Sequence, residues 1–136
     1  MIKIVVDSNI VISALLSAEG NPAKIMSLIA SDEDVLLFYS TGILDEYKRV
    51  LSYPRLNIDE EKQGRVILLV ENIGTLIEPH MSSIPLPDES DRIFYDTAEA
   101  IGAILITGNT KHYPAEDFIM TLSLFLRIMN SSGFVP

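Results

Sequence analysis

The chain has 136 residues, of which 48% are hydrophobic and 21% charged, so we expect one folded domain over residues 1–136 rather than a disordered chain. No apolar run reaches the roughly 18 residues of a membrane span. The absence of cysteine excludes disulfides and thiolate metal sites and suits a reducing cytoplasm. The net charge of −9 counts against a nucleic-acid partner, since such binding normally uses a basic surface. Acids that converge on metal ions weaken this objection, because the ions then carry the largest local charge.

Short β-branched runs alternate with longer helical stretches, which predicts an α/β fold. We expect a three-layer α/β/α sandwich with a central parallel sheet of four or five strands. In chain order, the expected elements are a strand over 2–6, a helix from 8 or 9 to 16, a helix over 21–30, a strand over 35–39, a helix over 41–51, a helix from 59, a strand over 75–77, a helix from 89 or 90 to 101, a strand over 104–107, a strand over 118–120 and a helix over 122–129.

Local signals set the ends of several of these helices. Asn21 stands before Pro22 as an N-cap, Asp59 opens an acidic first turn, and Gly102 is a C-cap. The first strand is continuously apolar, as expected for a central strand buried on both faces. The stretch over 118–129 is also compatible with a single helix.

Three carboxylates fall where these elements bring them toward one edge of the sheet, beyond the strand ends where parallel sheets bind ligands. Asp7 directly follows the first strand. Asp91 extends the apolar stripe of its predicted helix by one step, and Glu46 lies on an inward stripe between Ile43 and Val50. Buried carboxylates need a compensating partner, and a shared metal ion provides one.

Oxygen ligands without cysteine favour Mg²⁺ or Mn²⁺, which can polarise a phosphodiester and activate water. Each acid also has a simpler interpretation. Asp7 can cap the following helix, Glu46 can pair with Arg49 or Arg92, and Asp91 can serve only the helix dipole.

Four segments, taken together, resemble the PIN-domain family of metal-dependent ribonucleases, and most closely the VapC-like toxins of type II toxin–antitoxin pairs. The segments are IVVDSN (4–9), ILDEY (43–47) with Val50 and Leu51, DESDR (88–92) with Ala98, and LITGN (105–109) with KHYP (111–114). They stand in the family's order and cover nearly the whole chain.

The resemblance implies that Asp7, Glu46 and Asp91 hold Mg²⁺ or Mn²⁺ and position the attacking water, and that an antitoxin is a partner. The fourth family position is usually an aspartate in a Thr-x-Asp turn, and here it is Asn109. An amide oxygen can still orient a metal-bound water, but it contributes no charge.

Other polar residues have expected places around this site. Asp96 stands five residues after Asp91, about 140° around the helix, and is expected at the surface. Asp88 is expected to be an N-cap.

Ser8 and Thr107 can donate hydrogen bonds to the carboxylates. Lys111 and His112 either contact phosphate or belong to an ordinary solvated loop. Candidate contacts for the RNA backbone are Lys48, Arg49 and Arg55.

Two other functional classes remain open. In a phosphatase of the haloacid-dehalogenase type, Asp7 is the nucleophile and residues 104–107 are the strand-plus-threonine element. That class has an acid where this chain has Asn9, and it needs a later acidic pair, for which only Glu116 and Asp117 remain. A non-catalytic binding module is the other class, and it is motivated by Asn109 and the net charge of −9.

The segment over 118–129 is too apolar for one face of the fold to bury entirely. Some of its side chains are expected to lie against another protein, which predicts a homodimer.

Overall fold

The structure, a computed structural model, describes residues 1–131, and residues 132–136 of the predicted domain lie outside the described part. Five parallel strands form one sheet in the order β3-β2-β1-β4-β5. The strands are β1 (Ile2–Val6), β2 (Val35–Tyr39), β3 (Thr75–Leu76), β4 (Ile104–Thr107) and β5 (Ile119–Thr121). The predicted parallel sheet is therefore confirmed.

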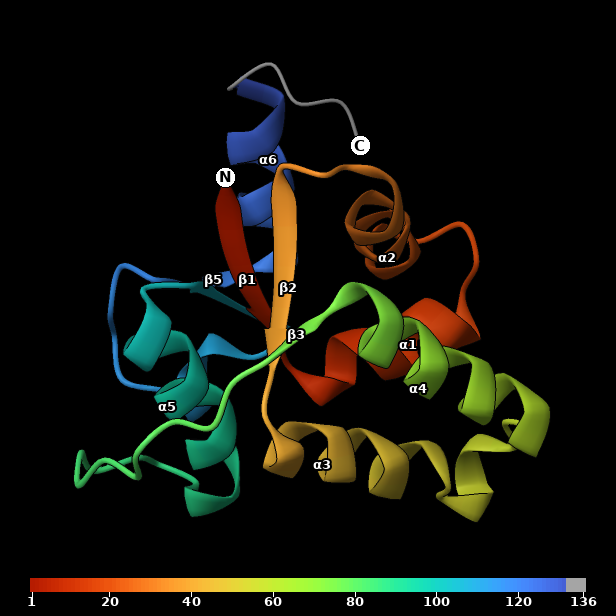
Figure 1. Cartoon of the computed structure of the whole chain (residues 1–136), viewed down its shortest axis with the longest axis horizontal. Helices are drawn as coiled ribbons and strands as arrows, with labels where there is room; N and C mark the ends of the chain where they lie inside the picture. Colours follow the sequence, from red (N-terminus) through yellow and green to blue (C-terminus); the bar gives the residue numbers. More distant parts are fainter. Residues whose placement is uncertain (132–136) are drawn as a thin grey trace.

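Helices cover both faces of this sheet. The helices are α1 (Ser8–Leu16), α2 (Asn21–Ser31), α3 (Thr41–Leu51), α4 (Glu60–Ile73), α5 (Arg92–Ile101) and α6 (Leu122–Ser131), with short 3-10 helices η1 (Pro54–Leu56), η2 (Glu89–Asp91) and η3 (Thr110–His112). Helix α5 packs on β1, β2 and β4 on one side, and α1, α2 and α4 lie on the other (Figure 1). Helix α3 crosses beyond the ends of the strands and contacts α1, α4 and α5. The expected α/β/α sandwich is confirmed.

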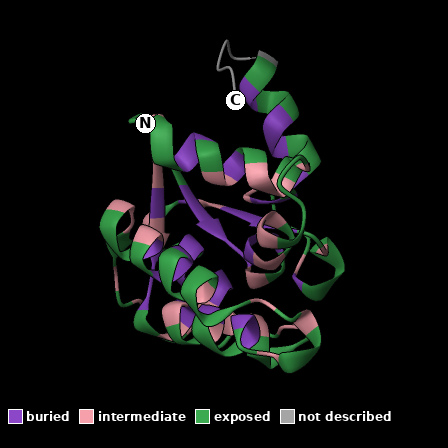
Figure 2. Ribbon diagram, turned by 90° about the vertical axis from the view of Figure 1, so that its right-hand side faces the viewer, coloured by how far each residue is buried: buried purple, intermediate pink, exposed green. Residues whose placement is uncertain are grey.

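The centre of the molecule is the strand pair β1 and β4. Ile4, Val5 and Val6 are buried, as are Leu105 and Ile106 on the neighbouring strand. Figure 2 shows this purple interior between helices whose outer faces are green. An apolar run in β1 is stable here because both faces of the strand are covered.

Most local signals in the sequence have the predicted effect. Gly102 ends α5 in the left-handed conformation at φ 66°, and the side chain of Asp59 accepts a hydrogen bond from the Lys62 amide at the start of α4. The N-cap of α2 is Gly20 rather than Asn21, which is the first helical residue, with Pro22 beside it. The helix predicted from residue 89 or 90 begins as η2 and continues as α5.

The apolar stretch over 118–129 is two elements rather than one helix. Strand β5 pairs with β4 through Leu105 and Ile119, and α6 then begins at Leu122. Among residues 1–131, no helix combines the length and the apolar character needed to cross a bilayer.

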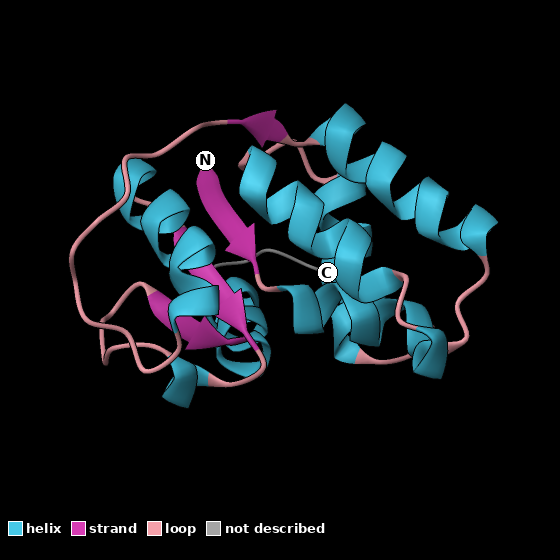
Figure 3. Cartoon of the chain, turned by 90° about the horizontal axis from the view of Figure 1, so that it is seen from below, coloured by secondary structure: helices cyan, strands magenta, loops and turns pink. Residues whose placement is uncertain are grey.

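The register of the sheet brings two site residues together. Val6 of β1 pairs with Ile106 of β4, so Asp7 and Thr107 both follow the carboxyl ends of adjacent strands. The Asp7 amide continues the pairing by donating to the Ile106 carbonyl at 2.9 Å. Figure 3 views the molecule from this edge, with helices on both sides of the strands.

Candidate active site

Asp7 is a buried carboxylate that accepts hydrogen bonds from three hydroxyl groups. Its Oδ2 accepts from Thr107 Oγ1 at 2.9 Å and from the Tyr113 hydroxyl at 2.8 Å, and its Oδ1 accepts a longer bond from Ser8 Oγ at 3.4 Å. The predicted donation by Ser8 and Thr107 is therefore confirmed. Although Asp7 occupies the N-cap position of α1, its side chain makes no capping bond, so the capping interpretation is wrong.

Asp91 lies at the junction of η2 and α5 with one oxygen unsatisfied. Its side chain is 13% exposed, and Oδ2 is buried without a hydrogen-bond partner among the described residues. His112 Nδ1 lies 3.4 Å from this oxygen without hydrogen-bond geometry. Burial, followed by repulsion from Asp7 and Asp88, raises the pKa of Asp91 to about 6. Asp91 makes no capping bond either, so α5 gains no side-chain cap from it.

Glu46 projects from α3 and forms an ion pair with Arg49, one turn later on the same helix. The structure therefore contains the ion pair that is the simpler alternative to metal binding by Glu46. Arg49 also donates to the hydroxyl of Tyr53, whose ring it stacks on at 5.5 Å. The negative charge of Glu46 nevertheless reaches Asp91 and contributes to its raised pKa. Glu46 is therefore near enough to influence the ionisation of Asp91, while its carboxylate is paired with Arg49.

Asn109 belongs to the turn that follows β4. Its side-chain oxygen accepts a hydrogen bond from the Lys111 backbone amide at 3.2 Å and so caps η3. The backbone amide of Asn109 donates to Thr107 Oγ1 at 3.1 Å. The side chain thus stabilises the loop over 109–113, in addition to any role at the fourth family position. Asp88, as predicted, is an N-cap: it accepts from the Ser90 amide at 3.0 Å and begins η2.

Asp96 is buried, so its predicted surface position is wrong. Only 4% of the residue is exposed, and its Oδ2 accepts from the Ser82 amide at 2.9 Å. The cause lies outside the helix. The loop preceding α5 folds back over it, and Arg92 holds this loop by donating to the carbonyls of Ser82 and Ile84. A face that helical periodicity predicts to be solvated is thereby covered.

Two buried tyrosines next to Asp7 are absent from the predicted site. Tyr113 donates to the Asp7 carboxylate, and Tyr47 donates to the backbone carbonyl of Val6. Burial first, and then the charge of Asp7, raises the pKa of both hydroxyls, so both remain donors at neutral pH. Tyr113 follows β4 in a short loop with no periodic pattern, so only its place in the KHYP segment distinguished it in the sequence.

The donor set fits a hard divalent cation in its chemistry. Asp7 Oδ1 has one long hydrogen bond and Asp91 Oδ2 has none, so each offers lone pairs, and all the ligating atoms are oxygens. Negative charge at the buried Asp91 carboxylate is costly, and a cation would offset it. Within residues 1–131, however, no three Asp, Glu, His or Cys side chains are already gathered closely enough to hold one ion. The Glu46 carboxylate is engaged by Arg49.

A sequence model of the PIN domain matches residues 3–111. An uncharacterized protein of Methanocaldococcus jannaschii is 32% identical over 111 residues, which make up 79% of this chain and 71% of that protein. The fold is similar to a chain of VapBC2 from Rickettsia felis, solved bound to a DNA fragment from its promoter, with a TM-score of 0.57 and 16% identity over 88% of this chain and 97% of that one. It is also similar to a chain of VapBC-1 from nontypeable Haemophilus influenzae, with a TM-score of 0.56 and 18% identity over 95% and 94% of the two chains. The match to the PIN-domain model over residues 3–111 shows that this chain belongs to the PIN-domain family.

Proposed function

We propose that this PIN-domain protein is a divalent-metal-dependent endoribonuclease and the toxin of a toxin–antitoxin pair. The observation that carries the proposal is the buried Asp7, whose side chain caps no helix, together with Asp91, whose Oδ2 has no hydrogen-bond partner among the described residues. By the resemblance to PIN-domain ribonucleases, the acids at the positions of Asp7, Glu46 and Asp91 hold Mg²⁺ or Mn²⁺. The fold supports the same use of these side chains, because β1, α3 and α5 bring all three toward the carboxyl edge of the sheet.

When bound, Mg²⁺ or Mn²⁺ supplies Lewis acidity toward a phosphodiester and lowers the pKa of water. The residues of the chain then have separate tasks. Asp7 and Asp91 offer the free oxygens, Thr107 keeps the Asp7 carboxylate oriented, and Glu46 joins them once it leaves Arg49. Asn109 can orient a water molecule through the lone pair of its amide oxygen that Lys111 does not use.

Cationic side chains beside the acids support a nucleic-acid substrate in spite of the acidic composition. Arg49 and Arg55 both lie against the ring of Tyr53, at 5.5 and 5.6 Å from its centroid, at the end of α3 that follows Glu46. Lys111 is exposed in η3, and His112 is half-exposed beside Asp91. We propose that these residues contact the phosphate backbone of RNA.

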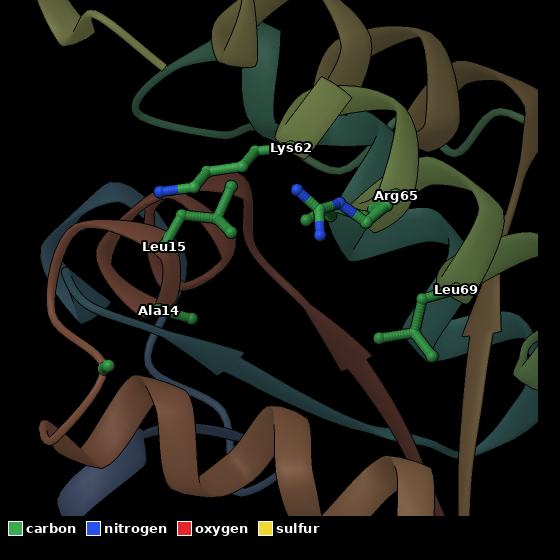
Figure 4. A pocket seen from close by; sticks show the side chains of 7 residues that line it. Ala14, Leu15, Lys62, Arg65 and Leu69 are labelled. Atoms are coloured by element: carbon green, nitrogen blue, oxygen red, sulfur yellow. The ribbon is translucent and has the colours of Figure 1, made fainter. Parts of the chain in front are cut away.

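A pocket between α1 and α4 supports an antitoxin partner. It is lined by Ala14 and Leu15 of α1 and by Lys62, Arg65 and Leu69 of α4 (Figure 4). A lining of apolar side chains together with two cationic ones is complementary to an acidic, partly apolar peptide segment. The similarity in fold to chains of VapBC2 and VapBC-1 motivates the same partner.

The test is cleavage of a mixed-sequence single-stranded RNA with Mn²⁺ or Mg²⁺, with a parallel reaction in EDTA. Wild type is compared with Asp7→Asn and with a charge-matched control, Asp45→Asn, in which the exposed acid beside Glu46 is changed. We expect EDTA and Asp7→Asn to abolish cleavage, with Asp45→Asn close to wild type. Undiminished cleavage by Asp7→Asn would contradict the assignment of Asp7.

A second candidate, a PIN-like module that binds a partner without turnover, is favoured by two observations. The Asn109 side-chain oxygen is engaged by the Lys111 amide, and Glu46 is engaged by Arg49. This candidate predicts that the folded wild type neither cleaves RNA nor binds Mn²⁺ at any concentration tested. Calorimetric titration with Mn²⁺ therefore separates the two candidates even before a substrate is known.

A further inference from the structure

The two oxygens of the Asp7 carboxylate have different surroundings. Oδ2 accepts two short hydrogen bonds, from Thr107 Oγ1 at 2.9 Å and from the Tyr113 hydroxyl at 2.8 Å. Within residues 1–131, Oδ1 has only the 3.4 Å hydrogen bond from Ser8 Oγ. Because a carboxylate oxygen has two lone-pair positions, the two hydroxyl donors together fill those of Oδ2.

We propose that Tyr113 is a positioning residue, which reserves Oδ2 of Asp7 and so leaves Oδ1 as the one oxygen that can bind a divalent cation. This inference rests on the proposed metal-dependent function. It adds a determinant of ligand geometry that lies outside the four acid positions, and it predicts that Asp7 binds through a single oxygen.

The path of the chain explains how a residue 106 positions away reaches Asp7. Strand β4 ends at Thr107, and the Asn109 side chain caps the following turn at Lys111. The Tyr113 amide donates to the Thr110 carbonyl at 3.2 Å, which closes the turn. Tyr113 itself is 4% exposed and belongs to the hydrophobic core, so packing of its ring fixes the place of its hydroxyl.

The energetic role of this hydroxyl follows from the burial of Asp7. A buried carboxylate requires hydrogen-bond donors, and hydroxyl bonds to a charged acceptor are stronger than bonds between neutral groups. Groups that hold a metal ligand in one orientation typically change metal affinity or activity by about 10- to 100-fold when they are removed. Tyr113 is suited to this task because it donates from a rigid, packed ring.

The test compares Tyr113→Phe with Tyr47→Phe. Each change deletes one buried tyrosine hydroxyl near Asp7 and keeps the ring, but the Tyr47 hydroxyl donates to the Val6 carbonyl and not to the carboxylate. We expect Tyr113→Phe to weaken Mn²⁺ binding, measured by calorimetric titration of the full chain, by about tenfold. Tyr47→Phe is expected to have an affinity for Mn²⁺ within about twofold of wild type, although its melting temperature should fall by about as much as that of Tyr113→Phe.

Cleavage kinetics provide a second readout. Because Tyr113 is proposed to act on Asp7 and not on RNA, we expect Tyr113→Phe to lower kcat at a fixed Mn²⁺ concentration while KM for RNA stays unchanged. Wild-type Mn²⁺ affinity in Tyr113→Phe would overturn the inference. An equal loss of affinity in Tyr47→Phe would also overturn it, because the effect would then be a general consequence of weakened packing.

The Asp7→Asn variant separates failure of this inference from failure of the proposed function. If Asp7→Asn abolishes Mn²⁺ binding and Tyr113→Phe leaves it intact, only the role of Tyr113 is wrong. If Asp7→Asn itself leaves Mn²⁺ binding intact, the metal site is wrong and the role of Tyr113 falls with it.

Discussion

Asp91 is the carboxylate whose environment disfavours its charge most clearly. Its pKa rises from 3.8 to about 6 because the group is buried and because Asp7 and Asp88 lie near it. In the metal-free protein the fold therefore favours the protonated acid. The stabilising contribution of this group is present below pH 3.8 and is lost as the pH rises through about 6.

We expect Asp91→Asn to be more stable than wild type at pH 8 in EDTA, by on the order of 1 kcal/mol. Between pH 4 and pH 8 the difference in melting temperature between the two proteins should move in favour of the variant. Titrating groups that do not interact with residue 91 are common to both proteins and cancel in this difference. Addition of Mn²⁺ at pH 8 should raise the melting temperature of wild type but not of the variant. A difference that does not change with pH would show that Asp91 ionises without a cost in stability.

The site residues differ in how far the sequence predicts their surroundings. Asp7 follows an apolar strand and Asp91 extends an apolar helical stripe, so strand ends and helical periodicity predict that both lie at the carboxyl edge. Tyr113 reaches Asp7 across 106 residues, and its neighbours carry no periodic signal. Asp96 is mispredicted for a related reason, since the loop held by Arg92 covers it. Periodicity describes one element, whereas these two contacts arise between elements.

At the level of elements, η3 joins the end of β4 to Tyr113, and its N-cap residue, Asn109, is the departure from the family pattern. The cap on this turn is the Asn109 side chain, and aspartate and serine cap a turn about as well as asparagine does. Substitution can therefore change the charge at this position without removing the turn. Substitutions of Asn109 that keep the cap therefore distinguish a structural role of this residue from a role in metal binding.

We expect Asn109→Asp to bind Mn²⁺ several-fold more tightly than wild type, because it adds a carboxylate at the fourth family position while preserving the cap. Asn109→Ser, which keeps a cap without charge, serves as the control and should have the affinity of wild type. Calorimetric titration and the cleavage rate at subsaturating Mn²⁺ measure the effect. Equal Mn²⁺ affinity in the aspartate variant and wild type would place residue 109 outside the metal site.

Element boundaries are predicted better than contacts because their signals are local. Gly102 and Asp59 act on the helix ends that they adjoin, and both have the predicted effect. The start of α2 differs from the prediction by one residue. Gly20, in an extended conformation, takes the N-cap position that was expected for Asn21. The ambiguity over 118–129 is resolved only by pairing of β5 with β4, which is a long-range contact.

At the level of the whole molecule, apolar side chains remain exposed on α6. Leu124 and Ile128 are 41% and 40% exposed, and their spacing of four residues puts them on one face of the helix. The same helix buries Leu122, Phe125, Leu126 and Met129 against the core. One fold therefore buries most of the predicted apolar segment but not all of it, which agrees with a second protein surface lying against α6.

We expect this face of α6 to contribute to a homodimer. The double variant Leu124→Asp with Ile128→Asp places two charges on the face and should sediment as a monomer at concentrations where wild type is dimeric, with an unchanged circular dichroism spectrum. Leu68→Asp is the matched control, because Leu68 is 58% exposed on α4, and it should leave the dimer intact. A wild type that sediments as a monomer at every concentration would refute self-association. A dimer that survives the double variant but not Leu68→Asp would move the interface to α4, the helix that also lines the proposed antitoxin pocket.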